Sequence, residues 1–247
     1  MSILRFCWRA IWMLLWLLVG LFSVACLLPL MGPKARQWMV RHCSSLLMLL
    51  CGVQTRVIGE PARVGAVLWV ANHISWLDIF VLNRVRATCF VAKSDIRHWP
   101  VIGWLVAGAG TVFIERSQRH AIKGVSQQMD QRFRRGEAVG LFPESTTSEG
   151  LNVRPFHAGL FEAAIAGNVD IQPVALRFYQ HGERTVRFAF VGDQSLMGNL
   201  WTLLSSRGVS VECEFLDRIP AGQCAAIGRS NCADLAYQAV RQAVEQP

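Results

Sequence analysis

The feature that most constrains this chain is a run of 22 residues without a charged side chain, residues 10–31. As an α-helix with a rise of 1.5 Å per residue, the run would be about 33 Å long, enough to cross a hydrocarbon layer about 30 Å thick. Large aromatic residues recur every four positions around its start, beside basic residues: Trp8, Trp12 and Trp16 with Arg5 and Arg9. That combination is typical of an anchor at a membrane interface. We therefore expect residues 1–53 to form an N-terminal membrane anchor.

Two kinds of cleaved leader are alternatives to a retained anchor. A signal peptide has an apolar core of about 7–15 residues before a cleavage site of small residues. This run is longer, and residues 27–30 continue it past the one candidate site. Residues 23–26 resemble a lipoprotein cleavage site, but Ser23 stands where leucine is expected. The sequence favours a retained anchor, either spanning or re-entrant.

The positive charge of the chain is concentrated on this anchor. The formal net charge is +8, and residues 1–59 hold six of the 25 Lys and Arg residues but no Asp or Glu. A second apolar stretch, residues 43–53, is too short to span and follows several basic residues, so we expect a helix in the interface. Such basic residues are drawn to anionic lipid headgroups. Because they flank the apolar run on both sides, they do not decide its orientation.

Composition and missing motifs exclude several classes of protein. An apolar content of 52% is too high for a disordered chain. The excess charge does not lie on a helix or sheet with interleaved aromatic residues, so we expect no nucleic-acid partner. The absence of G-x-S-x-G, G-x-x-x-x-G-K-S/T, H-E-x-x-H and G-x-G-x-x-G motifs argues against common hydrolase, nucleotide-binding and zinc-protease designs. The eight cysteines include no C-x-x-C pair, and we expect them to be reduced.

The rest of the chain, residues 54–247, alternates short apolar runs with helical patterns and reads as one domain. The predicted strands are residues 54–58, 66–70, 88–92, 111–114, 138–142, 171–178, 185–191 and 209–215. The predicted helices are residues 75–83, 101–107, 118–135, 159–166, 196–204 and 231–245. This alternation predicts an α/β fold: a mixed, largely parallel sheet covered by helices and preceded by the N-terminal membrane-anchoring helical segment.

One pair of residues suggests chemistry at the end of the strand at residues 66–70. His73 and Asp78 are five positions apart, which on one continuous helix would turn them about 140° away from each other. With His73 in a loop and Asp78 in the first helical turn, the carboxylate can accept the Nδ1 proton and leave Nε2 as a base. An alternative makes Ser75 the N-cap and Asp78 a capping-box residue. The spacing alone leaves both readings open. His157 and Glu162 share this spacing, and we assign His157 a structural role.

Two further strand ends carry polar side chains. The strand at residues 111–114 ends in Glu115 and Arg116, and the strand at residues 138–142 opens into a loop with Glu144, Ser145 and Thr146. In a parallel sheet these ends meet at one edge. There they would combine a His–Asp base, an arginine suited to phosphate and a loop of hydroxyl donors.

The order of these blocks resembles the glycerolipid acyltransferase family. The blocks are Asn72-His73-x4-Asp78, Val112-Phe113-Ile114-Glu115-Arg116, Phe142-Pro143-Glu144-Ser145-Thr146 and Ile171-Gln172-Pro173-Val174. The resemblance implies that His73 is the catalytic base and that Asp78 orients it. It also implies that Arg116, with Lys93 as a second candidate, binds the acceptor phosphate. Substrate-binding roles follow for the remaining candidates: Glu144, Ser145 and Thr146 at the headgroup and Pro173 near the acyl chain.

For function, the resemblance implies transfer of a fatty acyl group from acyl-CoA or acyl-carrier protein to 1-acylglycerol 3-phosphate, which makes phosphatidic acid. No metal or cofactor is expected, and the catalytic domain is expected on the cytoplasmic side of the inner membrane. Two departures put the acceptor in doubt: Ser145 replaces the usual glycine and Thr147 an arginine that often follows. A lyso-aminolipid such as lyso-ornithine lipid is therefore an alternative acceptor. A non-catalytic membrane-attached binding protein and a lipid hydrolase are further alternatives.

Overall fold

The computed structural model describes residues 2–98, 102–108, 110–114 and 119–246. Within these residues an eight-stranded sheet forms the centre of the molecule, in the order β1-β8-β6-β2-β5-β3-β4 with β7 paired to β6. The strands are β1 (Val53–Gly59), β2 (Val67–Ala71), β3 (Thr88–Lys93), β4 (Val112–Ile114), β5 (Ala138–Leu141), β6 (Ile171–Gln180), β7 (Glu183–Arg184) and β8 (Val209–Phe215). Strands β6, β2, β5, β3 and β4 run parallel, whereas β8 lies antiparallel to β6 and pairs in parallel with β1. The predicted mixed, largely parallel sheet is confirmed.

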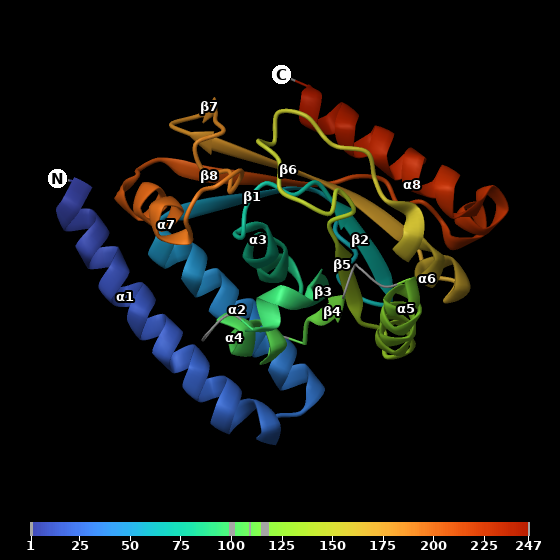
Figure 1. Ribbon diagram of the computed structural model, residues 1–247, viewed down its shortest axis with the longest axis horizontal. Helices are drawn as coiled ribbons and strands as arrows, with labels where there is room; N and C mark the ends of the chain where they lie inside the picture. Colours follow the sequence, from blue (N-terminus) through green and yellow to red (C-terminus); the bar gives the residue numbers. More distant parts are fainter. Residues whose placement is uncertain (1, 99–101, 109, 115–118, 247) are drawn as a thin grey trace.

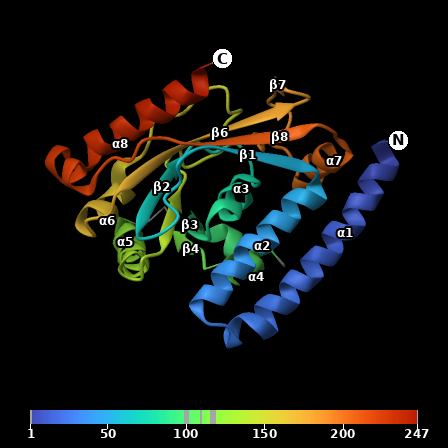
Figure 2. The same cartoon turned by 180° about the vertical axis from the view of Figure 1, so that it is seen from behind.

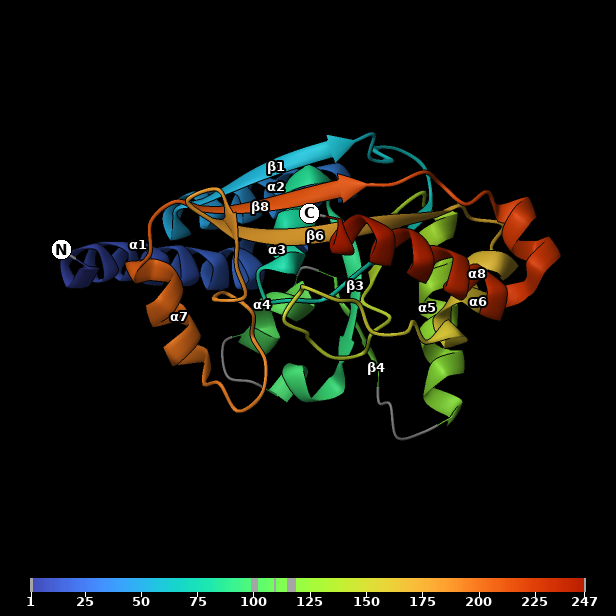
Figure 3. The same ribbon diagram turned by 90° about the horizontal axis from the view of Figure 1, so that it is seen from above.

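Helices cover both faces of this sheet (Figures 1 and 2). On one side lie α2 (Pro33–Cys51) and α3 (Asp78–Val85), and on the other lie α5 (Arg119–Arg134), α6 (Phe161–Ala166) and α8 (Ala221–Glu245). The short α4 (Ile102–Gly108) contacts the N-terminal segment. Seen from above, α1 (Ser2–Phe22) and α7 (Leu196–Ser205) gather at the end of the molecule away from α5, α6 and α8 (Figure 3). The sheet therefore separates the hydrophobic cluster that contains residues of α2 and α3 from the clusters that contain residues of α5, α6 and α8.

The N-terminal segment is helical and largely exposed. Helix α1 continues through a π-helical turn (Ser23–Leu27) and a 3-10 turn (Leu28–Leu30), and residues Ser2–Leu30 are long and apolar enough to cross a membrane. Large apolar side chains are exposed along α1: Ile3, Leu4, Trp8, Ile11, Leu14, Leu15, Leu18, Val19 and Phe22. Helix α1 nevertheless contacts the domain, because Trp16 Nε1 donates to Cys43 O at 3.0 Å.

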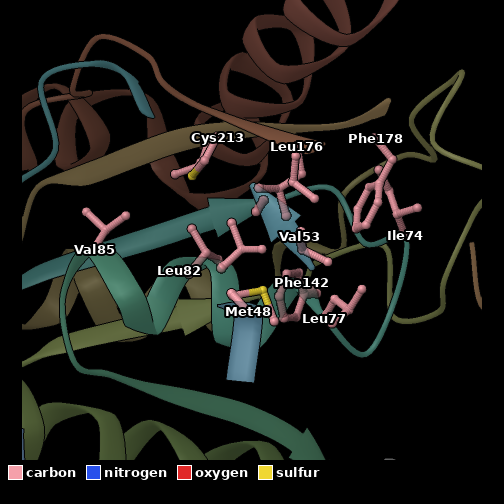
Figure 4. Packing of buried hydrophobic residues seen from close by; sticks show 14 of the residues in the cluster. Met48, Val53, Ile74, Leu77, Leu82, Val85, Phe142, Leu176, Phe178 and Cys213 are labelled. Carbon is pink, nitrogen blue, oxygen red and sulfur yellow. The ribbon is translucent and has the colours of Figure 1, made fainter. Parts of the chain in front are cut away.

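Helix α2 is longer than the apolar stretch at residues 43–53, and it belongs to the core. Leu47, Met48 and Cys51 are buried in the same cluster as residues of the sheet and α3, where Figure 4 shows Met48 beside Leu82. The prediction placed this stretch in the membrane interface, but one of its faces is covered by protein. The division of the chain at residue 53 stays a prediction.

The predicted strand at residues 185–191 is wrong. After the two residues of β7 this segment forms turns, although Phe188 and Ala189 are fully buried. Strand β8 pairs along one edge of β6. On the other edge β2 pairs only as far as Val174, and the Asn72 side chain then binds both backbone groups of Leu176, so the segment stops pairing after Thr185 N donates to Phe178 O. The apolar residues of this segment pack into the core although the segment is a loop and not a strand.

The C-terminal helix also differs from its prediction. Helix α8 begins at Ala221, ten residues before the predicted start, and kinks at Gly228, whose φ is 77°. Glycine adopts this left-handed conformation without a Cβ clash. Cys224 and Cys232 form a disulfide across the kink. The expectation that all cysteines are reduced is therefore wrong for this pair, which the helical kink brings together.

Candidate active site

The candidate site begins where β2 leaves the sheet. Asn72 follows the last residue of β2 and is completely buried. Its Oδ1 accepts from Leu176 N at 2.8 Å and its Nδ2 donates to Leu176 O at 3.0 Å, so its carboxamide continues the pairing with β6. A buried carboxamide with donor and acceptor both used has one orientation. Asn72 thus determines where His73 leaves the sheet.

Asp78 organises the loop that follows. His73 Nδ1 lies 2.8 Å from Asp78 Oδ2, and the same oxygen accepts from Ile74 N at 2.7 Å and Ser75 N at 2.9 Å. Because a carboxylate can only accept, Nδ1 carries the proton and Nε2 keeps its lone pair. Asp78 is fully buried, whereas the His73 side chain is 21% exposed. This arrangement suits a histidine base that receives a proton from a bound substrate.

The capping-box alternative is wrong in its helix boundary. Helix α3 begins at Asp78, its N-cap position is Leu77, and no side chain caps it. Ser75 therefore lies in the loop, where its N–H donates to Asp78. The bond from Ser75 N to Asp78 is one that a capping box would also contain, but Ser75 Oγ has no hydrogen-bond partner and so does not cap the helix. Asp78 therefore supports both the loop and the imidazole.

Aromatic rings cover one face of the imidazole. The rings of His73 and Phe142 stack with centroids 4.1 Å apart and planes 14° apart. Phe142 in turn stacks on Phe90 of β3 at 5.5 Å. This stack limits rotation of the imidazole and keeps water from that face. Phe142 is not among the predicted site residues, and its signal in the sequence is an aromatic residue placed directly after β5.

Glu144 connects the histidine loop to the next loop. It is 3% exposed, its Oε1 accepts from His73 N at 2.7 Å and its Oε2 accepts from Arg154 N at 2.8 Å. Burial raises the pKa of Glu144, and the two backbone N–H groups oppose that shift. Both carboxylate oxygens thus accept from backbone N–H groups, so Glu144 holds the backbone at His73 and at Arg154 in place. Its predicted contact with the acceptor stays a prediction.

The hydroxyl-rich loop also braces His73. Ser148 N donates to His73 O at 2.7 Å, and Thr147 Oγ1 donates to Phe190 O at 2.5 Å. Ser145 adopts a left-handed φ of 63°, which is unfavourable for a residue with a Cβ. The loop therefore adopts the backbone conformation that suits a glycine while carrying a serine. Ser145 and Thr146 lie in this loop beside Glu144, as expected.

The remaining predicted site residues lie elsewhere. Lys93 ends β3, two strands away from β2, and is an exposed residue paired with Asp95. Pro173 is buried on β6 opposite Val70, three residues before His73, and so lies within the sheet. Arg116 lies outside the described residues. His157 is exposed, and its N–H donates to Pro143 O at 3.0 Å. The structure thus brings together His73, Asp78, Glu144 and the 145–147 loop.

No metal centre is apparent in the described part of the chain. Within residues 2–98, 102–108, 110–114 and 119–246, no three His, Cys, Asp or Glu side chains lie close enough to hold an ion.

Known proteins are similar to this chain in sequence and in fold. A family model described as "Acyltransferase" matches residues 54–177. The chain is 36% identical over 216 residues to a lyso-ornithine lipid O-acyltransferase of Pseudomonas aeruginosa, which covers 87% of this chain and 80% of that protein. It is 40% identical over 162 residues to a 1-acyl-sn-glycerol-3-phosphate acyltransferase of Neisseria gonorrhoeae, covering 64% and 63% of the two chains. The crystal structure of the 1-acyl-sn-glycerophosphate acyltransferase PlsC from Thermotoga maritima has a TM-score of 0.66 over 96% of each chain at 20% identity, which is a likeness of fold.

Proposed function

The chain belongs to the glycerolipid acyltransferase family, and from that premise we propose that it transfers a fatty acyl group from a thioester to the free hydroxyl of a lysolipid. The observation that carries the proposal is the 2.8 Å contact between His73 Nδ1 and the fully buried Asp78 Oδ2. A non-catalytic scaffold would not need a buried carboxylate that orients a partly exposed imidazole.

In the proposed reaction His73 Nε2 accepts the proton of the acceptor hydroxyl while its oxygen attacks the thioester carbonyl. A C–O bond forms, the C–S bond breaks and the thiolate leaves with the electron pair. The proton then passes from His73 to the thiolate or to water. Asp78 stabilises the imidazolium that exists between these steps. Positioned base catalysis of this kind contributes about 10²–10⁴-fold.

The donor in this proposal is acyl-CoA or an acyl-carrier protein. Both release a thiolate, a good leaving group, so the reaction requires neither a metal or cofactor nor a covalent enzyme intermediate. Arg116 and Lys93 are proposed to bind an acceptor phosphate. Ser145, Thr146 and Glu144 are proposed to shape the headgroup site, and Pro173 is proposed to lie near the acyl chain.

The first proposed acceptor is 1-acylglycerol 3-phosphate, so that the product is phosphatidic acid for phospholipid synthesis. The name of the relative from Neisseria gonorrhoeae supports this choice. Lyso-ornithine lipid is the second candidate. It is favoured by the loop at residues 145–147, which holds three hydroxyl residues and no basic one, with Thr147 donating to Phe190 O. The relative from Pseudomonas aeruginosa supports it as well.

We also propose that the protein works at the cytoplasmic face of the inner membrane. The exposed apolar side chains of α1 supply a surface for lipid, and the basic residues around them would favour anionic headgroups. The cytoplasm is where acyl-CoA and acyl-carrier protein are available.

The test offers both acceptors to the purified protein in mixed micelles, with one acyl chain supplied first as acyl-CoA and then on acyl-carrier protein. Free thiol and acylated product are measured together, in the presence and absence of acceptor. Thiol release matched by product with either acceptor supports acyl transfer, and the ratio of kcat/KM identifies the acceptor. Thiol release without acceptor would indicate a hydrolase, and no thiol release with either donor would contradict the proposal.

A further inference from the structure

We propose that Asn199, on α7, is a positioning residue for the His73–Asp78 loop and acts through the indole of Trp76. The inference rests on the proposed function for its kinetic consequences. Its structural content, that Asn199 keeps this loop ordered, stands on contacts of the described residues.

The contact joins two residues that are 123 positions apart in the chain. Trp76 Nε1 donates to Asn199 Oδ1 at 3.0 Å. Asn199 is 5% exposed, and its Nδ2 donates to Ala189 O at 3.1 Å and to Gln194 Oε1 at 3.2 Å. Because an indole nitrogen can only donate, the carboxamide oxygen must face Trp76 and the amide must face Ala189. The side chain of Asn199 is therefore held in one orientation.

Trp76 is part of the loop that carries the catalytic pair. It lies three residues after His73 and two before Asp78, in a loop whose amides at Ile74 and Ser75 bind Asp78. Asp78 holds this loop through its backbone amides. The indole holds it through Asn199 and an edge-on contact with Phe80 at 6.0 Å between ring centroids. A loop fixed at both its backbone and its indole keeps the imidazole aligned with the carboxylate.

Asn199 reaches the same loop by a second path. Its amide holds Ala189 O, and the next residue, Phe190, donates its N–H to Ile74 O at 2.9 Å. Phe190 O also accepts from Thr147 Oγ1, in the hydroxyl-rich loop. One buried carboxamide thus braces the segment that joins β7 to α7 against both loops of the candidate site.

Helix α7 is itself held by the N-terminal helix. Arg9 Nη1 donates to Ser206 O at 2.8 Å and to Leu204 O at 3.2 Å, and Arg5 Nη1 donates to Ser205 O at 2.5 Å. These arginines satisfy carbonyl groups at the carboxyl end of α7, where a helix lacks internal partners. The ring of Phe6 also lies 4.5 Å from that of Trp201. The position of Asn199 therefore depends on how α1 packs against α7.

The test compares Asn199→Leu, Asn199→Asp and Trp76→Phe in the full-length protein. Asn199→Leu preserves much of the volume but removes the acceptor of the indole and both donors. Asn199→Asp keeps an acceptor for the indole. The matched control on the same helix is Thr202→Val, because Thr202 Oγ1 donates only to Gly198 O within α7. Asn83→Leu is a second control, since buried Asn83 accepts from Thr88 N away from the loop and its loss affects stability.

The first readout is hydrogen–deuterium exchange of peptides that cover residues 73–78, which needs no substrate. We expect exchange to become at least about tenfold faster in Asn199→Leu and to stay unchanged in Thr202→Val and Asn83→Leu. Unchanged exchange in folded Asn199→Leu overturns the inference, whatever the enzyme's acceptor is.

The second readout is transfer by the same proteins. We expect kcat to fall about tenfold in Asn199→Leu while the KM values for donor and acceptor stay within about twofold. In Asn199→Asp the fall should be smaller, because the acceptor of the indole remains and only the amide donor is lost. The double variant Trp76→Phe/Asn199→Leu should be no slower than Asn199→Leu alone, because each change removes the same hydrogen bond between the indole and the carboxamide. Multiplicative losses contradict the inference. Absence of transfer by the wild-type protein would instead count against the proposed function, with the exchange result still deciding the role of Asn199.

Discussion

The imidazole of His73 and the carboxylate of Asp78 meet through Nδ1 and Oδ2 at 2.8 Å, and the same oxygen holds the two amides between them. Asp78 is thus bound to the catalytic loop three times. Loss of this carboxylate would remove both the orientation of the base and the order of the loop. His73 and Asp78 are therefore the first residues to mutate.

We expect His73→Ala to abolish acyl transfer while the protein still accumulates in membranes. Asp78→Asn should lower kcat by at least about a hundredfold, because a neutral amide cannot stabilise the imidazolium that forms when His73 takes the proton. The control is His157→Ala, an exposed histidine with the same spacing to an acidic residue, which should retain activity. Transfer by His73→Ala at more than a few per cent of the wild-type rate would exclude His73 as the base.

The buried carboxyl of Glu144 predicts a dependence of stability on pH. Its pKa is raised from an ordinary value of 4.5, chiefly by burial, so the folded protein binds this proton more tightly than the unfolded chain does. Its contribution to stability is therefore complete below the unfolded pKa and decreases as pH rises through the folded pKa. Relative to Glu144→Gln, the wild-type protein should lose melting temperature between pH 4.5 and pH 7.

Glu144 should also matter for activity, because its oxygens accept from His73 N and Arg154 N. Glutamine offers one acceptor where two are needed, so Glu144→Gln should lower kcat at neutral pH. The exposed Glu149→Gln is the matched control and should change neither quantity. A difference in melting temperature between wild type and Glu144→Gln that does not vary with pH would contradict the linkage.

Ser145 predicts a stabilising substitution. Its φ of 63° is unfavourable for a side chain with a Cβ, and glycine adopts it without that cost. Ser145→Gly should raise the free energy of unfolding by about 0.5–1 kcal/mol, the relief of strain exceeding the added entropy of the unfolded chain. Ser145→Ala keeps the Cβ and removes the hydroxyl, so it should not be stabilised. Equal denaturation midpoints for both variants would show that strain at this position is negligible.

Met48 tests whether α2 belongs to the folded domain. It is completely buried among residues of α3 and the sheet, whereas neighbouring Leu49 is 73% exposed. Met48→Ala should lower the free energy of unfolding by about 2–5 kcal/mol through lost contacts and the cavity that remains. Leu49→Ala should change it by less than about 0.5 kcal/mol in detergent. Similar effects of both substitutions on thermal unfolding would mean that α2 acts mainly as a lipid-facing helix.

Membership of the family follows from the blocks between Asn72 and Val174, and most strands appear within a few residues of their apolar runs. The segment at residues 185–191 shows where periodicity fails. Alternating apolar residues report that Phe188 is buried, but not whether a strand edge is free to pair with the segment. In this fold β8 pairs along one edge of β6 and the Asn72 carboxamide occupies Leu176 on the other, so the segment becomes a loop beyond Thr185.

The His73-x4-Asp78 pair could be predicted because its geometry is local. Five residues and one helix start are enough to bring a carboxylate to an imidazole, and the long uncharged run of residues 10–31 likewise indicates an apolar helix without any tertiary information. Both features can be predicted from the chain alone, since each depends on residues that are neighbours in it.

The residues that hold the pair in place come from distant parts of the chain, and they are identified by the folded structure alone. Phe142 stacks on His73 from the end of β5, and Asn199 reaches Trp76 across 123 residues. Pro173, grouped with the site by its motif, lies within the sheet because the β2–β6 register places it opposite Val70. Spacing in the sequence says nothing about register or about which helix covers a loop, because those follow from how apolar faces pack once the sheet has formed.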